Sequence, residues 1–170
     1  MQNHATTHSR DRWQTVNKKD NHIEKMGIKG YLDNSLNKYF IRTLNKKGFE
    51  LTESDIRGMG GMYRFKSNWL NFEIVNDRGI IETRISSIYS KHYYDFDLIN
   101  AYFNRKNKSN GENSKLGKSD LSKRLNLEQE SKLFESNLSE LETMFNELNY
   151  KQTELELNEI GNERAKLLFE

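Results

Sequence analysis

Carboxylates form the clearest pattern among the side chains of this sequence that could bind a partner. In the last third of the chain, Glu residues recur on a segment whose opposite side is apolar, which would present a carboxylate surface on a rigid helix. Such a surface complements a basic protein, such as the cleft of a nuclease, and speeds its approach. The same charges would also suit a helix face that is only solvated. We predict a partner-binding surface of Glu128, Glu135, Glu140, Glu142 and Glu147.

A basic connector precedes these carboxylates. Residues 104–125 carry seven basic and two acidic groups, whereas residues 126–170 carry eleven acidic and four basic groups. This asymmetry indicates either a charged partner or compensation between the two segments. The connector has no interleaved aromatic residues for base stacking, and the acidic segment beside it would repel phosphates, which disfavours nucleic acid. As an alternative reading, nucleic-acid contacts would come from Lys115, Lys118, Lys123 and Arg124.

The remaining polar residues give weaker signals for catalysis. His92 is the only His beyond residue 25 and could act as a general base, but a single His among aromatic residues is more typical of a packed loop. Asp95 and Asp97 could bind a metal ion, yet helix capping explains both. We therefore predict no catalytic residue, no metal ligand and no cofactor.

Composition narrows the class of protein. The 170 residues include no Cys, which excludes disulfides and thiolate metal sites, and 31% are charged. No apolar run approaches the length of a membrane span, and the first residues lack the apolar stretch of a secretory signal, so we expect a cytoplasmic protein. Twenty Asn and seventeen Lys suggest an AT-rich bacterial genome.

Elements that would position these residues follow from periodicity. Apolar residues spaced by three and four predict a helix over 31–47, and Gly48 suits its left-handed end. Residues 49–85 alternate with period two between turns, which predicts three or four antiparallel strands in a meander. In that register Glu73 and Arg84 share the wetter face. Asp95 is expected to begin a short helix.

The C-terminal segment has a different pattern. Apolar residues repeat every seven positions from Leu127 to Leu148, interrupted by Ser131, and this seam requires a packing partner. A break follows near Tyr150, and Thr153 with Glu156 resembles a capping box that would open a last helix. We expect a helical hairpin, and an unfilled seam would favour a homodimer.

Taken together, the patterns predict an α+β fold: an N-terminal helix, the meander, a short helix and a C-terminal helical hairpin. The predicted divisions are a flexible polar tail (1–25), an α+β domain (26–103), a basic linker (104–120) and an acidic helical hairpin (121–170).

A resemblance adds a functional expectation. The stretch YRFKSNWLNFEIVNDRG (63–79), then DFDLI (95–99) and a helical end with ERAK (163–166) resemble uncharacterised bacterial immunity-type proteins found beside polymorphic secreted toxins. The resemblance covers roughly residues 28–103 and extends more loosely to 170. It implies a non-enzymatic protein that binds and neutralises a cognate toxin, and it assigns no functional residue. We therefore expect a cytoplasmic protein-binding protein, with nucleic-acid association through residues 104–124 as the alternative.

Overall fold

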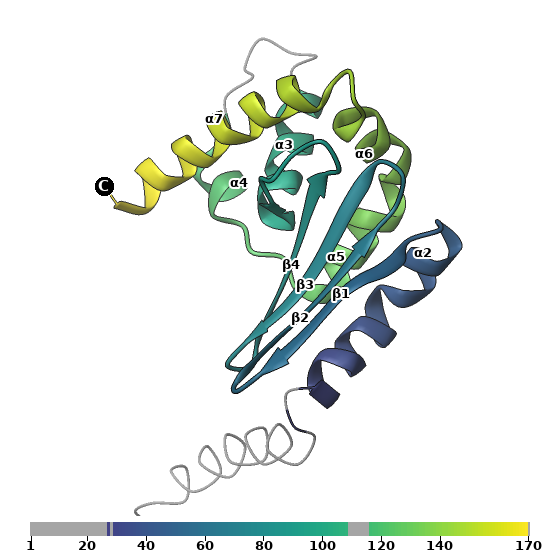
Figure 1. Cartoon of the computed structure of the whole chain (residues 1–170). Coiled ribbons are helices and arrows are strands. Elements are labelled where there is room, and N and C mark those ends of the chain that lie inside the picture. Colours follow the sequence, from purple (N-terminus) through teal and green to yellow (C-terminus); the bar gives the residue numbers. More distant parts are fainter. Residues whose placement is uncertain (1–26, 28, 109–115, 170) are drawn as a thin grey trace, which may run out of the picture.

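The chain folds into an α+β structure in which helices pack on a five-stranded antiparallel sheet (Figure 1). The computed structural model describes residues 27, 29–108 and 116–169. The predicted tail (1–25) lies outside the described residues, as do residues 109–115 of the predicted linker (104–120). The α+β class and the helical C-terminal region are confirmed.

The first helical segment matches the predicted helix over 31–47. Residues 29–39 are helical, a turn follows at Phe40, and helix α2 spans Ile41–Lys46. The apolar stripe Leu32, Leu36, Phe40 and Leu44 is buried against the sheet. The end of the segment is as predicted, because Gly48 has a φ of 71° and the N–H of Phe49 donates to the carbonyl of Leu44 at 3.0 Å.

We expect Gly48→Ala to lower the free energy of unfolding by about 1 kcal/mol, because L side chains rarely adopt this backbone conformation. No atom lies within 4 Å of a Cβ built at Gly48, so the cost is conformational rather than steric. Gly117→Ala is the matched control, since its φ of −76° suits any residue. Urea unfolding measures both variants, and equal losses would contradict the assignment.

The sheet contains five strands where the sequence predicted three or four. Their order is β1-β2-β3-β4-β5, and every pair is antiparallel. The extra strand is short: Tyr94 and Asp95 pair with Ile85 and Arg84, and two residues are too few to give a periodic signal. The strands are β1 (Glu50–Arg57), β2 (Gly60–Lys66), β3 (Leu70–Asp77), β4 (Ile80–Ser87) and β5 (Tyr94–Asp95).

The C-terminal region contains more helices than the predicted hairpin. The single helix expected from Leu127 to Leu148 is interrupted at Asn137, whose φ of −114° lies outside the helical range. The last helix begins at Tyr150, four residues after Asn146, whose carbonyl accepts the N–H of Tyr150 at 3.0 Å. The helices are α3 (Phe96–Lys108), α4 (Lys118–Ser122), α5 (Leu127–Ser136), α6 (Leu138–Phe145) and α7 (Tyr150–Phe169).

Two polar residues of the C-terminal pattern make contacts that the sequence did not reveal. Ser131, which interrupts the seam, donates its hydroxyl to the carbonyl of Tyr39 at 2.5 Å. Thr153 is not a helix cap; it lies buried within α7 and donates to the carbonyl of Met144 at 2.8 Å. Both hydroxyls therefore fasten one helix to another.

One buried core joins the two halves of the chain. Phe134 of α5 lies 5.4 Å from the ring of Phe72 on β3 and 6.0 Å from that of Phe49. The seam residues Phe134, Leu141 and Phe145 are fully buried within the chain, so these side chains offer no surface to a second copy. A homodimer stays a prediction, and its interface would have to use other residues.

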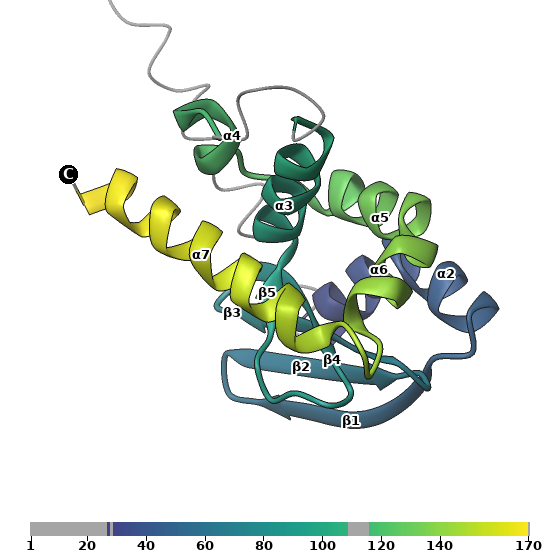
Figure 2. The ribbon, with the colours of Figure 1, turned by 90° about the horizontal axis from the view of Figure 1, so that it is seen from above.

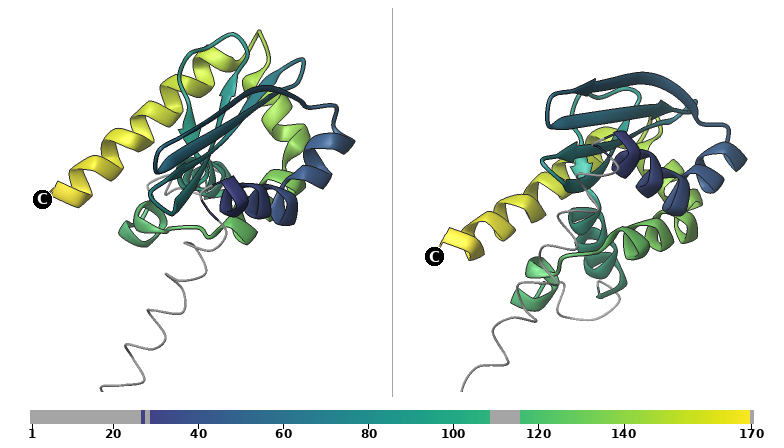
Figure 3. Two further views of the ribbon diagram at one scale, coloured as in Figure 1. Left: turned by 60° about the horizontal axis from the view of Figure 1, so that its bottom comes forward. Right: turned by 90° about the horizontal axis from the view of Figure 1, so that it is seen from below.

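The helices lie on one side of the sheet, which leaves the other face uncovered by them (Figure 2). Inward-facing residues such as Phe72 and Ile85 are buried beneath the helices, and the alternate residues, such as Arg64 and Arg84, form the outer face. Helices α2 and α7 lie at opposite sides of the molecule (Figures 2 and 3). In the described part of the chain, no helix combines the length and apolarity needed to cross a bilayer.

Candidate functional site

The predicted acidic residues are spread over α5, α6 and the turn that follows. Glu128 and Glu135 lie on α5, Glu140 and Glu142 on α6, and Glu147 in the turn before α7. All but the half-buried Glu140 are exposed, because the opposite sides of the two helices are anchored in the core. The carboxylates therefore stand on a rigid base.

The five carboxylates differ in how far their charge is balanced within the chain. Glu128 pairs with Lys132 at 2.6 Å, and Glu140 pairs with Lys106 of α3 at 2.7 Å. Among the described residues, no basic side chain forms an ion pair with Glu135, Glu142 or Glu147. These three keep an uncompensated negative charge at the surface.

The turn after α6 presents an apolar side chain directly after Glu147 in the sequence. The side-chain oxygen of Asn146 accepts the N–H of Leu148 at 3.0 Å and that of Asn149 at 2.9 Å. The side-chain amide of Asn149 donates to the carbonyl of Thr143 at 2.9 Å, which fastens the turn to α6. Leu148, the last residue of the predicted seam, is 89% exposed instead of buried. We call Glu135, Glu142, Glu147 and Leu148 the docking face.

The basic connector is largely balanced by acidic residues of the same chain. Lys108 pairs with Asp120, Lys106 with Glu140, and Arg105 with Glu163 at 2.6 Å. The charge asymmetry had two explanations, a charged partner or compensation between the two segments. These ion pairs show that compensation within the chain takes place.

The four predicted nucleic-acid contacts are not gathered into one free patch. Arg124 pairs with the buried Asp97 at 2.9 Å. Lys118 is the first residue of the short helix α4 and Lys123 follows its end; both are exposed, and Lys115 lies outside the described residues.

Sequence reasoning missed a cleft of about 400 Å³ beside β4 and β5, lined in part by Thr83, Asp95, Asp97 and Glu130. Glu130 faces this cleft rather than the acidic helix surface, and its carboxylate accepts the hydroxyl of Thr83 at 2.5 Å. Burial raises the pKa of Glu130 to about 7, and the negative charges of Asp97 and Asp95 add to the effect, while the bond from Thr83 opposes it. No periodic signal distinguishes Glu130 from its exposed neighbours on α5.

Chemically, the acidic residues of this cleft are occupied by structural contacts. Asp95 accepts the N–H of Leu98 at 2.7 Å, which confirms the predicted helix cap. Asp97 accepts the N–H of Leu125 at 2.7 Å and also pairs with Arg164 at 3.2 Å. Within residues 27–108 and 116–169, no three His, Asp or Glu side chains are placed to hold a metal ion. The cleft therefore combines a carboxyl group of raised pKa, that of Glu130, with ion pairs and hydrogen bonds that stabilise the fold.

A ladder of alternating charges crosses the outer face of the sheet, one residue from each strand. The register pairs Glu53 with Arg64, Arg64 with Glu73, Glu73 with Arg84, and Arg84 with Asp95. The predicted same-face placement of Glu73 and Arg84 is thus confirmed. Such cross-strand pairs stabilise one register over its neighbours, because a slip would bring like charges together.

Glu73 is the buried centre of this charge ladder. Its side chain is only 7% exposed, it accepts two hydrogen bonds from Arg64 at 2.7 and 3.2 Å, and Arg84 lies 4.0 Å away. The guanidinium carbon of Arg64 in turn lies 5.5 Å from the ring centroid of Tyr93. The charges on the central strands are therefore balanced by other residues of the ladder, and the ladder stabilises the sheet.

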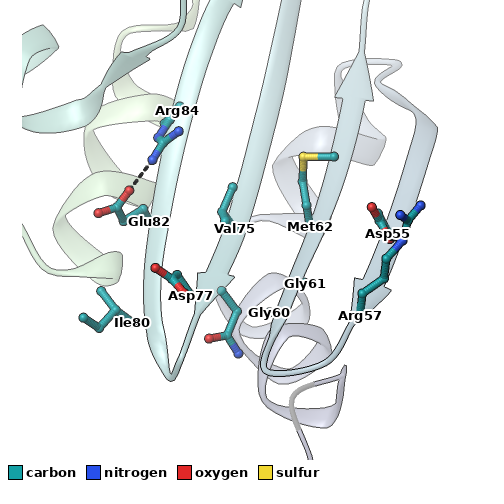
Figure 4. Close-up of a pocket in the computed structure, with 11 residues that line it drawn as sticks. Asp55, Arg57, Gly60, Gly61, Met62, Val75, Asp77, Ile80, Glu82 and Arg84 are labelled. Carbon is teal, nitrogen blue, oxygen red and sulfur yellow. Dashed lines mark hydrogen bonds and ion pairs between the residues drawn. The ribbon is translucent and has the colours of Figure 1, made fainter.

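A shallow hollow of about 580 Å³ lies on the outer face near the hairpin turns (Figure 4). Met62 and Val75 supply its apolar side chains, and ion pairs link Asp55 to Arg57 and Glu82 to Arg84. Asp77 lines the hollow as well, so the hollow presents an excess of one negative charge to a ligand.

His92 lies exposed in the loop between β4 and β5, where its backbone N–H donates to the hydroxyl of Ser90 at 3.0 Å. Gly58 and Met59 form the turn between β1 and β2, with Gly58 at a φ of 56°. Comparisons with protein-family models, curated proteins and solved structures found no match for this chain.

Proposed function

We propose that this chain is a non-enzymatic protein-binding protein of the immunity type, which neutralises a basic toxin by docking it on the docking face. The observation that carries the proposal is the set of exposed carboxylates without a basic partner among the described residues, Glu135, Glu142 and Glu147. Their helices are anchored by the core, so little side-chain or backbone order would be lost on binding.

The chemistry of the docking face supports a protein partner over a small ligand. Protein interfaces combine a few apolar anchors with charges that steer the encounter. Leu148 provides an anchor held outward by the Asn146 turn, and Glu147 and Glu142 provide charge near it in the sequence. Glu128 and Glu140 contribute less, because each already has a basic partner in the chain.

Affinity capture from the organism that encodes the chain, at high salt, identifies the partner by mass spectrometry. The expected result is one stoichiometric protein with a basic surface. The triple variant Glu135→Lys, Glu142→Lys, Glu147→Lys should then slow association roughly tenfold at low salt, and the difference should shrink as salt is added.

Asp77→Lys is the control for this experiment, because Asp77 is also an exposed acid and lies at the turn end of the β3–β4 hairpin. It should leave the association rate unchanged. An association rate that falls equally in both variants would contradict the docking face. Recovery of nuclease-sensitive nucleic acid alone would contradict protein binding and favour the connector with Lys118 and Lys123.

A further inference from the structure

Strand β1 forms an open edge of the sheet. It pairs with β2 on one side, and no described strand pairs with its other side, so half of its backbone groups face outward without a strand partner. Leu51 is 54% exposed at this edge although its side chain points toward the inner, apolar face, where it lies opposite Phe65. An open edge with exposed apolar residues is a template for a further strand.

A groove of about 520 Å³ runs beside this edge, between β1 and the helical segment of residues 29–46. Figure 3 shows that segment lying next to the β1–β2 hairpin, whereas α7 lies away from it. The groove is open because the helical layer covers the inner face of β2 and β3 but stops short of β1. Its apolar lining is Leu36, Ile41, Phe49, Leu51, Tyr63 and Phe65, and polar side chains that include the ion pair of Lys29 with Asp33 line the rest.

The charge ladder defines what the next strand would carry. Read from β5 to β1, its signs alternate and end at Glu53, a negative residue that the next strand would face. Glu50 and Asp55 belong to the same outer face of β1, since they lie opposite Lys66 and Met62. Arg57 is on this face too and pairs with Asp55 at 2.7 Å, so Glu50 and Glu53 supply the excess negative charge. Opposite charges across a strand pair stabilise it and like charges oppose it. A sixth strand would therefore need Lys or Arg on its outer face.

We propose that β1 binds an extended segment of a partner protein, in which basic residues alternate with apolar ones. The segment would pair with the backbone of β1, place Lys or Arg opposite Glu53, and direct its alternate apolar side chains into the groove. Backbone pairing supplies affinity in this mode of recognition, and the side-chain pockets supply specificity. This surface is separate from the docking face and extends the proposed function to a second contact.

The same features select against a second copy of this chain as the occupant. Two antiparallel β1 strands paired over residues 53–57 would place Asp55 of one copy opposite Asp55 of the other, where the two carboxylates repel, although Glu53 would face Arg57. The register shift between Leu51 and Glu53 bends the edge, and the hydroxyl of the bulged residue Thr52 bonds back to the carbonyl of Arg64. Regular pairing is thus limited to residues 53–57.

The test titrates the isotope-labelled full chain with an eight-residue peptide of alternating lysine and valine, and with a control peptide of alternating glutamate and valine. For the lysine peptide we expect saturable NMR shifts confined to β1 and the groove, and slowed amide exchange in β1. Glu53→Lys should weaken its binding by roughly fivefold or more. Ile41→Glu, which places a charge in the groove, should weaken it independently of the ladder.

Glu135→Lys is the matched control, because it alters the docking face and leaves β1 intact, so the two surfaces succeed or fail separately. It should bind the lysine peptide as the native chain does. Equal binding of both peptides, shifts that map to α5 and α6, or no saturable binding would each overturn the proposal. Thermal unfolding of every variant confirms that a loss of binding does not reflect a loss of fold.

Discussion

Replacing Glu73 by Gln is expected to lower the free energy of unfolding by about 3 kcal/mol. Glu73 is the buried acid between Arg64 and Arg84, and its removal leaves two guanidinium groups side by side without the charge that joins them. A buried ion pair adds little net stability, but the loss of one partner is costly because the other remains partly desolvated. Urea unfolding at neutral pH measures the change.

The opposite end of the same ladder supplies the control for Glu73. Glu53 contacts the same guanidinium, Arg64, but lies half-exposed at the edge of the sheet. Glu53→Gln should therefore cost about 1 kcal/mol or less. If both substitutions had the same small effect, the ladder would contribute little to the stability of the sheet, and the core alone would determine the strand register.

Glu130→Gln is expected to stabilise the chain by about 3 kcal/mol at pH 8 and by little at pH 4. Burial raises the pKa of Glu130 from its ordinary 4.5 to about 7, so the folded chain holds a proton that the unfolded chain has released. The stability contributed by this proton is full below pH 4.5 and is lost as pH rises through 7. Glutamine stays neutral and still accepts the hydroxyl of Thr83.

Unfolding curves recorded at several pH values between 4 and 8 test this expectation. The native chain should lose stability relative to Glu130→Gln across that range. Glu128→Gln is the control on the same helix: Glu128 is exposed, and its hydrogen bond with Lys132 lowers its pKa, so its removal should not relieve the loss at high pH. Parallel curves for the native chain and Glu130→Gln would show that Glu130 titrates normally.

Much of the sheet could be predicted from local patterns, because each hairpin is encoded within a short stretch of chain. The alternation around Glu73 and Arg84, with a turn at Gly79, determines which residues lie opposite each other. The helix ending at Gly48 was predictable for the same reason. Strand β5 was not, since it is defined by a tertiary contact of Tyr94 and Asp95 with β4.

The candidate sites were harder to predict, because they depend on contacts between distant segments. Glu130 and Glu135 have the same residue type on one helix, yet Glu130 meets Thr83, 47 residues earlier, and Glu135 meets solvent. Likewise, the seven-residue repeat implied a continuous helix, but the break at Asn137 lets α6 turn toward the same core. Sequence periodicity reports that a face is apolar without identifying what covers it.

The strands of the sheet lie in the order of the sequence, and this order governs how the chain acquires its structure during synthesis. Each strand pairing closes a short loop, so the meander can form as soon as it leaves the ribosome. The helical segment of residues 29–46 precedes the sheet, but the rest of the cover arrives later, since Phe145, whose carbonyl accepts the hydroxyl of Ser87, follows that residue by 58 positions. Protein synthesis adds roughly 5–20 residues per second, so part of the aromatic face of the nascent sheet stays exposed to solvent for several seconds. In that interval the nascent chain is most vulnerable to aggregation. The interval ends when α5 and α6 are synthesised and pack on the sheet.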